Sequence, residues 1–256
     1  MPVNLNYQIY GAGAPLFILH GLFGSGRNWN SIARQLSNSN QVVTVDLRNH
    51  GDSEHADSMT YTEMAEDIVR LATDLGHDSF KLVGHSMGGK TAMTAALLYP
   101  EKVGSLVIVD IAPVSYPSSH DELITALQSL PLTTLTSRNQ ADQMLAEQID
   151  NPTLRQFLLQ NLVRDKDGYK WRINLDAIQT NHSLLRDFPA ELQGGHYAGP
   201  MLLLSGGQSD YIQSEHQPII TGFFPNTDHR IIRDANHWVH ADKPDRVIEE
   251  IRAFLE

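Results

Sequence analysis

The feature that most constrains this chain is residues 82–99, where an apolar run leads into a serine flanked by glycines. Residues 84–88 read G-H-S-M-G, and a good helix-forming sequence follows them. Strand, very tight turn and helix form the context in which G-x-S-x-G places a nucleophilic serine at the tip of a turn. Positions two before and two after Ser86 crowd in such a turn, which explains glycine at both.

The same stretch also fits a phosphate-binding pattern. Residues 84–91 match G-x-x-x-x-G-K-[ST], again between a strand and a helix. The next apolar strand ends at Asp110, which could serve as the magnesium-binding partner of a nucleotide hydrolase. Lys90 and Thr91 are equally ordinary residues for the first turn of a helix. Two chemistries therefore share one loop, and the rest of the chain has to separate them.

Apolar patterning predicts alternating strands and helices in the first part of the chain. Alternation of apolar residues over 3–10 predicts a half-buried antiparallel strand. Uniformly apolar runs predict strands covered on both faces, and they lie at 16–19, 42–46, 80–83 and 103–111. Helices are expected between them, one of them capped by Thr60 with Glu63 three residues on. This alternation predicts an α/β fold with a mostly parallel twisted sheet and helices on both faces.

The alternation breaks after Ala112-Pro113. Residues 115–199 contain helix-like segments and one hairpin-like loop, expected at 121–130, 139–149, 152–163, 174–185 and 167–171. This region is too apolar to be a disordered linker. Apolar strands resume at 201–205 and 230–232, and a closing helix is expected over 243–255. We therefore expect a core domain of residues 1–114 and 200–256, with residues 115–199 inserted as a helical cap, or lid.

Charge and composition exclude several classes of function. The net charge of −11 argues against nucleic-acid partners, which need a basic face. The absence of cysteine excludes disulfides, thiolate nucleophiles and zinc sites built on sulfur. The first residues show neither the basic nor the apolar region of a signal peptide, and no stretch is long enough to cross a bilayer. A cytoplasmic protein without a membrane partner is the expectation.

Four separated motifs resemble the α/β-hydrolase superfamily in their order along the chain. They are His20-Gly21 after the strand at 16–19, D-L-R-x-H-G-x-S at 46–53, the turn at Ser86, and a late His237. The resemblance covers the whole chain, including the position of the cap. Further segments at 109–113, 171–175, 206–209 and 236–238 resemble the bacterial esterases typified by YbfF. The phosphate-loop interpretation explains none of these segments, so we favour serine chemistry.

The resemblance implies the main catalytic roles. Ser86 is the expected nucleophile, and His237 the expected general base and then general acid, because it follows the last strand and precedes the final helix. The other nearby histidines are expected to be structural or surface residues, namely His20, His50, His85 and His240. A metal held by His237 and His240 is not expected, since no third ligand pattern accompanies them. No cofactor is expected.

The acid of the triad has two candidates. Most α/β-hydrolases place it a few residues beyond the strand that follows the cap, where this chain has Ser209, with Asp210 one position late. Asp110 instead ends the strand before the cap, and the resemblance to the YbfF-type esterases implies that the acid comes from there. We favour Asp110, because a triad is defined by geometry and not by sequence position.

Backbone N–H groups of Leu22 and Met87 are the expected oxyanion donors, since they follow His20-Gly21 and Ser86. Four aromatic residues near these loops are expected to form pocket walls: Phe23, Tyr116, Tyr211 and Trp238. Asp46, Arg48 and Asp52 are expected to hold their own loop together and not to touch substrate.

The sequence therefore predicts a serine hydrolase that cleaves carboxylic esters through an acyl-enzyme. The resemblance implies short to medium acyl esters and acyl-CoA thioesters as small-molecule substrates. Three alternatives stay open at this point: a triad enzyme acting on C–C or amide bonds, a P-loop-type NTPase using residues 84–91, and a binding protein on a hydrolase scaffold. The sequence does not predict an oligomeric state.

Overall fold

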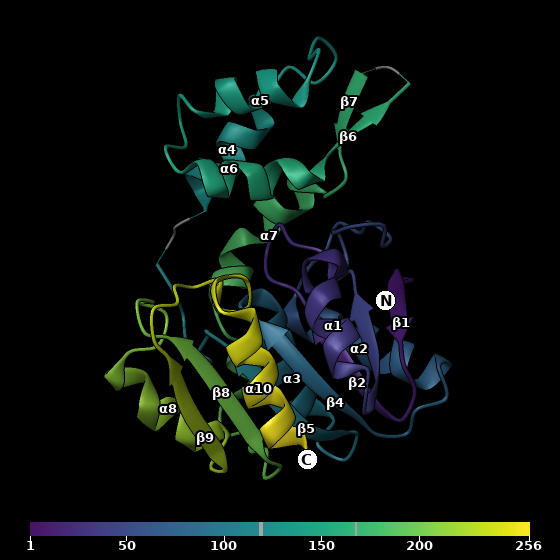
Figure 1. Cartoon of the computed structure of the whole chain (residues 1–256), viewed down its shortest axis with the longest axis vertical. Helices are drawn as coiled ribbons and strands as arrows, with labels where there is room; N and C mark the ends of the chain where they lie inside the picture. The colour runs from purple at the N-terminus through teal and green to yellow at the C-terminus, as the bar shows by residue number, and fades with distance from the viewer. Residues whose placement is uncertain (118–119, 167) are drawn as a thin grey trace.

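The structure is a computed structural model that describes residues 1–117, 120–166 and 168–256. A seven-stranded sheet runs through the core in the order β1-β3-β2-β4-β5-β8-β9 (Figure 1). Its strands are β1 (Tyr7–Tyr10), β2 (Ala14–Leu19), β3 (Asn40–Val45), β4 (Phe80–His85), β5 (Val103–Val109), β8 (Met201–Gly206) and β9 (Thr227–Ile232). Only β1 pairs antiparallel within this sheet, with β3. The predicted α/β-hydrolase fold is confirmed.

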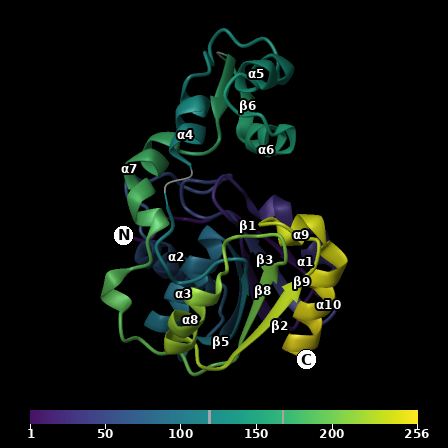
Figure 2. The same cartoon turned by 90° about the vertical axis from the view of Figure 1, so that its left-hand side faces the viewer.

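Successive strand residues supply two separate cores, because side chains alternate between the faces of a sheet. In β2, Leu16 and Ile18 face one core, and Phe17 and Leu19 face the other. The first core is covered by α1 (Asn30–Leu36) and α10 (Pro244–Leu255), and the second by α2 (Tyr61–Asp74) and α3 (Met87–Leu98). Figure 2 shows these two pairs of helices on opposite sides of the sheet. Both faces are therefore sealed, which leaves the strand ends to carry chemistry.

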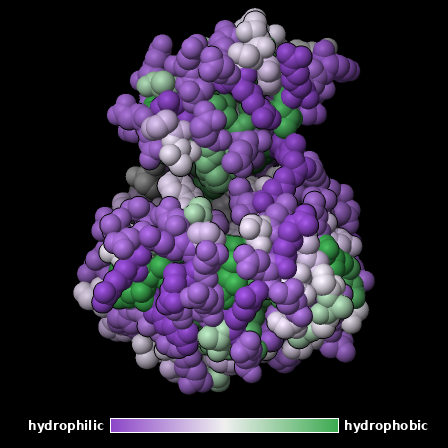
Figure 3. All heavy atoms as spheres, viewed as in Figure 1, coloured by the Kyte–Doolittle hydropathy of each residue, from purple (hydrophilic) through white to green (hydrophobic). Residues whose placement is uncertain are grey.

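The segment between β5 and β8 stands over one end of the sheet (Figure 1). It contains α4 (Asp121–Gln128), α5 (Arg138–Leu145), α6 (Pro152–Leu158), η2 (Leu159–Asn161), β6 (Leu162–Asp165), β7 (Gly168–Trp171), α7 (Leu175–Arg186) and η3 (Ala190–Leu192). Figure 3 shows a mostly hydrophilic face that narrows where this upper part meets the core. We call residues 115–199 the cap segment.

Two expectations about local structure are wrong. The helix expected over 152–163 ends at Leu158, and after η2 its last residues pair as β6 with β7 in an antiparallel hairpin. Asp167, in the expected hairpin-like loop, lies outside the described residues. The strand expected over 3–10 begins only at Tyr7, because the backbone N–H groups of Val3 and Asn4 donate to Asp67 and Glu54 side chains instead. This strand is also largely exposed at the sheet edge, not half-buried.

Short core elements complete the fold. They are η1 (Gly26–Trp29), η4 (Ser214–His216), α8 (Gln217–Phe223) and α9 (Val239–Asp242). The expected capping box is present at the start of α2, where the Thr60 side chain accepts from the Glu63 N–H and the Glu63 carboxylate accepts from the Thr60 N–H. Within the described ranges, none of the helices has the length and apolar character needed to span a membrane.

Candidate active site

The turn between β4 and α3 holds Ser86 in a strained backbone conformation, with φ 52° and ψ −119°. A Cβ on Gly84 would lie 2.3 Å from the Gly88 carbonyl oxygen, so the expected crowding across the turn is real. A Cβ on Gly88 would instead meet the carbonyl oxygen of Leu19 in β2 at 2.4 Å. The second glycine thus lets the start of α3 pack against the neighbouring strand. The result is a serine side chain at the carboxyl end of the sheet.

Ser86, His237 and Asp110 form a continuous hydrogen-bonded chain. The Ser86 Oγ lies 3.0 Å from His237 Nε2, and His237 Nδ1 lies 2.8 Å from Asp110 Oδ2. Because a carboxylate only accepts, Nδ1 carries the hydrogen and Nε2 is left to accept the proton of the serine hydroxyl. These residues follow β4, β9 and β5, so the sheet brings together positions that are far apart in the sequence.

Asp110 supplies the carboxylate at the end of this hydrogen-bonded series of side chains. Its side chain is fully buried and accepts further hydrogen bonds from the Gly206 N–H at 3.0 Å and from the Ser209 hydroxyl. Asp210 is exposed, and among the residues that the structure describes only its backbone carbonyl has a hydrogen-bond partner, the Gln213 side chain. Sequence reasoning missed the part played by Ser209, which occupies the position where an acid was first sought. Its hydroxyl now positions the acid.

Two N–H groups are free to stabilise an oxyanion. Within the described parts of the chain, neither the Leu22 nor the Met87 N–H donates a hydrogen bond to another group. The Met87 N–H stands at the N-terminus of α3, where the helix dipole favours negative charge. Leu22 and Met87 both line space next to Ser86. Two unused N–H donors next to a serine hydroxyl are the groups that an oxyanion site requires.

Two buried histidines hold the loop that carries Leu22. His20 accepts from the Leu47 N–H at 3.0 Å and lies 2.8 Å from the Gly21 carbonyl oxygen. His50 accepts from the Phe23 N–H at 3.2 Å and donates to the Arg48 carbonyl. Burial lowers the pKa of both imidazoles, that of His50 to about 3, so both are neutral and can accept. Their place is structural, as expected.

His85 and His240 lie closer to the triad than sequence reasoning expected. His85 Nε2 lies 2.9 Å from the backbone carbonyl oxygen of His237 and donates to it, which anchors the loop of the base. The His240 ring packs against His85 and stacks on Trp29 at 4.3 Å between centroids. Burial lowers the pKa of His85 and lowers that of His240 to about 3. The one feature of the sequence that could have indicated these roles is that His85 precedes Ser86 directly and His240 follows His237 by three residues.

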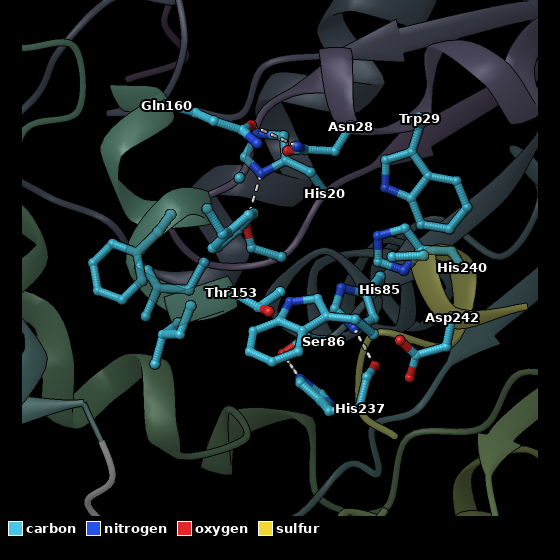
Figure 4. A pocket seen from close by; sticks show the side chains of 18 of the residues that line it. His20, Asn28, Trp29, His85, Ser86, Thr153, Gln160, His237, His240 and Asp242 are labelled. Carbon is cyan, nitrogen blue, oxygen red and sulfur yellow. Dashed lines mark hydrogen bonds between the residues drawn. The ribbon is translucent and has the colours of Figure 1, made fainter. Parts of the chain in front are cut away.

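A cavity of about 590 Å³ opens beside Ser86 between the core and the cap segment (Figure 4). Three of the expected wall residues line it: Phe23, Tyr211 and Trp238. Tyr211 stacks on the His237 ring at 3.7 Å, and Trp238 contacts Phe157 of α6 in the cap segment. The cap segment adds further side chains to the lining, namely His120, Leu123, Thr153, Leu154, Gln156, Phe157 and Gln160. The cavity is large enough for an acyl chain.

Tyr116 does not line this large cavity. It lines a space of about 50 Å³ on another side of Ser86, together with Met87 and Lys90. The Tyr116 hydroxyl accepts from the Ala112 N–H and donates to the Tyr211 carbonyl, so it braces the strand end next to Asp110. The expectation that Tyr116 forms a wall applies to this smaller space only.

Lys90 has a structural place that the phosphate-loop interpretation did not foresee. Its Nζ donates to the backbone carbonyls of Val114, Arg186 and Asp187, at 2.8, 2.6 and 2.9 Å. It thereby ties α3 to both ends of the cap segment, and burial lowers the pKa of its amine to about 7. The two glycines of the pattern lie in regular elements, Gly84 in β4 and Gly89 in α3, and not in an open loop. The nucleotide-binding interpretation of residues 84–91 is therefore wrong.

Of the three residues expected to hold the loop after β3 together, Asp46 does so, whereas Arg48 pairs with α2 and the Asp52 carboxylate pairs with Arg27 and Arg172 outside the loop. Asp46 accepts from the N–H groups of Gly26 and Asp52, at 2.7 and 2.9 Å. Arg48 is fully buried and its guanidinium bonds both oxygens of Asp67, at 2.7 and 2.9 Å. Neither lines the cavity beside Ser86. Among residues 1–117, 120–166 and 168–256, no three His, Asp or Glu side chains gather as a metal site.

Comparisons with known proteins agree with this geometry. Residues 14–244 match the family described as the alpha/beta hydrolase fold. The chain is 43% identical over 99% of its length to the "sn-1-specific diacylglycerol lipase ABHD11" of Xenopus laevis, covering 84% of it. Its identity to "Esterase YbfF" of Escherichia coli is 34%, over 94% of the chain and 93% of the relative. A solved structure described as "Marine microorganism esterase" superimposes with a TM-score of 0.95 at 40% identity, covering 98% of this chain and 99% of that one. Both resemblances drawn from the motifs are confirmed.

Proposed function

The chain belongs to the α/β-hydrolase family and is an ester hydrolase, and we propose that it works through a covalent acyl-enzyme on Ser86. The observation that carries this proposal is the hydrogen-bonded chain from Ser86 through His237 to the buried Asp110. In this arrangement His237 Nε2 faces the serine hydroxyl, and the Asp110 carboxylate fixes the ring through Nδ1.

The reaction proceeds in two halves. His237 Nε2 takes the Ser86 proton as Oγ attacks the ester carbonyl, and the N–H groups of Leu22 and Met87 stabilise the resulting oxyanion. The C–O bond to the alcohol breaks, His237 returns the proton to the alcohol oxygen, and the acyl group stays on Oγ. A water then gives its proton to His237 and attacks the acyl carbon. The carboxylic acid leaves and Ser86 regains its proton.

We propose that the cap segment forms a separate cap over a core of residues 1–114 and 200–256. Support comes from the lining of the large cavity, to which both parts contribute side chains. The cap then selects the acyl chain, with short to medium acyl esters and acyl-CoA thioesters as the substrate classes.

A cytoplasmic location is a separate part of the proposal. Fractionation of cells, with an antibody against the chain to detect it, tests this location.

Ser86→Ala tests the mechanism. We expect kcat for a p-nitrophenyl acyl ester to fall roughly 10⁴-fold or more, because the nucleophile is gone. Ser214→Ala, at an exposed serine of η4, is the matched control and should keep full activity. A fluorophosphonate should label wild type and fail to label Ser86→Ala. Normal turnover by the Ser86→Ala protein would reject the acyl-enzyme.

Product analysis over a substrate panel tests the bond that is cleaved. The panel contains p-nitrophenyl esters of increasing acyl length, acyl-CoA thioesters, a diacylglycerol, and matched amides and ketones. We expect turnover of esters and thioesters and none of amides or ketones. Faster cleavage of an amide or a C–C bond would replace the ester assignment while keeping the triad.

A further inference from the structure

A second cavity, of about 250 Å³, adjoins the catalytic one, and three arginines line it. Arg27 belongs to η1 in the core, Arg138 begins α5, and Arg172 directly follows β7. The rest of the lining is mostly polar: Phe23, Ser25, Asn28, Gln160 and Asn161. No carboxylate lines this cavity in the described part of the chain. We call it the arginine pocket.

The arginine pocket is separated from the catalytic cavity by one side-chain bridge. Asn28 and Gln160 line both cavities, and the Asn28 amide donates to Gln160 Oε1 at 3.1 Å (Figure 4). Phe23 also lines both, and its neighbour Leu22 carries one of the free N–H groups beside Ser86. The two cavities therefore share a wall made by Phe23, half-buried Asn28 and exposed Gln160, which places the arginine pocket next to the cavity that holds Ser86.

Charge in the arginine pocket is positive. Asp52 pairs with two of its arginines, Arg27 at 3.1 Å and Arg172 at 3.5 Å. Arg138 directs Nε and Nη2 to the Leu162 carbonyl, a neutral partner. Two guanidinium groups thus share one carboxylate and the third has none, which leaves the pocket positive in a chain whose net charge is −11. Guanidinium donors in a fork match the paired oxygens of phosphate and carboxylate groups.

We propose that the arginine pocket binds an oxyanion, a phosphate or a carboxylate, carried by the departing half of the substrate. The inference rests on the proposed function, because it assigns a substrate class to the same site. The large cavity beside Ser86 is lined mainly by apolar and aromatic groups and suits the acyl chain. The charged end therefore belongs to the other half, whose anion lies between cap and core.

The test uses one acyl group on straight-chain alcohols of increasing length, each ending in a phosphate, a carboxylate or a methyl group. At one or more lengths we expect an anionic ester to have a KM about tenfold below that of the neutral ester, from one or two charge-assisted hydrogen bonds. kcat should change little, because the anion is bound equally in the ground and transition states. Raised salt should weaken the preference. Whichever ester, phosphate or carboxylate, has the larger decrease in KM relative to the neutral ester identifies the anion that the pocket binds.

Variants decide whether the arginines cause this preference. Arg27→Gln and Arg172→Gln should lose most of it, while Arg246→Gln should keep it, since Arg246 is an exposed residue of α10 that pairs with Glu249 and Glu250. Asp52→Asn should increase the preference, because it frees two guanidinium groups. This gain cannot arise from a damaged fold.

Two results overturn the proposal. One is equal KM values for anionic and neutral esters at every length in the wild type. The other is a preference that Arg27→Gln and Arg172→Gln retain as fully as Arg246→Gln does. Neutral-ester turnover that depends on Ser86 is measured alongside, so failure of the acyl-enzyme mechanism is distinguished from failure of the arginine pocket.

Discussion

Asp110 shows how a single side chain is fitted to catalysis. Its backbone is left-handed, with φ 54°, and its buried carboxylate takes hydrogen bonds from His237, Gly206 and Ser209. Such a backbone conformation is unfavourable for a non-glycine residue and persists only where the surroundings enforce it. The carboxylate is thereby aimed at the imidazole, and the acid is held without help from solvent.

Asp110→Asn should therefore cripple the enzyme, and Asp210→Asn should not. An asparagine cannot hold the hydrogen on His237 Nδ1 as a carboxylate does, so we expect kcat to fall roughly 10³- to 10⁴-fold. Asp210 is exposed and its carboxylate has no role in the triad geometry, so Asp210→Asn should stay near wild type. The measurement is kcat on a p-nitrophenyl ester. A greater loss in Asp210→Asn would show that the acid is misassigned.

Motifs along the chain predict Ser86 and His237 directly, whereas Asp110 is favoured over Asp210 only through the resemblance to the YbfF-type esterases. Asp110 and Asp210 both follow strands, and patterns along the chain cannot tell which carboxylate faces the imidazole. The hydrogen bonds made by His85 and Ser209 are not predictable from the sequence for a related reason. Their roles consist of one hydrogen bond each to a distant residue, and a single sequence carries no record of such pairs.

The turn between β4 and α3 is the element on which the site depends. Gly84→Ala should damage it, because the new Cβ would lie 2.3 Å from the Gly88 carbonyl oxygen, a backbone atom that cannot move alone. We expect a loss of about 1–3 kcal/mol in the free energy of unfolding and most of the activity. Urea unfolding and ester turnover measure the two effects.

Gly222→Ala, in α8, is the matched control. Nothing lies within 4 Å of the Cβ it would add, so stability should stay level or rise, since alanine favours a helix over glycine. Equal behaviour of Gly84→Ala and Gly222→Ala would contradict the close approach across the turn.

Elements were predicted best where one periodicity persists. Strands buried on both faces and the capped α2 were found because their apolar patterns are long and uniform. The apolar pattern predicts a helix over 152–163, and yet its last two residues, Leu162 and Val163, pair with β7. A short apolar segment fits the periodicity of a helix as well as that of a strand. Whether a second strand is available to pair with it decides which one forms.

Across the whole molecule, four neutral histidines are buried around the site: His20, His50, His85 and His240. Burial lowers the pKa of each below its ordinary value of 6.5, to about 3 for His50 and His240. An unfolded chain takes up protons on these residues below pH 6.5, and the folded chain does not. For His50 and His240, stability therefore falls as pH drops from about 6.5 toward 3, by up to about 1.4 kcal/mol per pH unit for each of the two, and the lowered pKa values of His20 and His85 act in the same direction.

His240→Phe should reduce this acid sensitivity. Phenylalanine keeps a ring against Trp29 and removes one group that must be protonated on unfolding. Urea unfolding of both proteins at neutral and mildly acidic pH should show a shallower decline in the variant. Parallel declines would mean that His240 is already protonated in the folded state.

Linear pattern alone was enough to predict the sheet with its buried strands, the serine at a glycine-flanked turn, the late histidine and the interruption of the strand–helix alternation after β5. These features depend on local backbone chemistry and on apolar periodicity, which a linear pattern records. Tertiary structure alone decided which aspartate serves the imidazole, what Lys90 binds, and that three arginines from distant segments share one pocket. Such pairings depend on which strand ends and loops become neighbours in the folded chain. The order of residues along the chain does not give these distances in space.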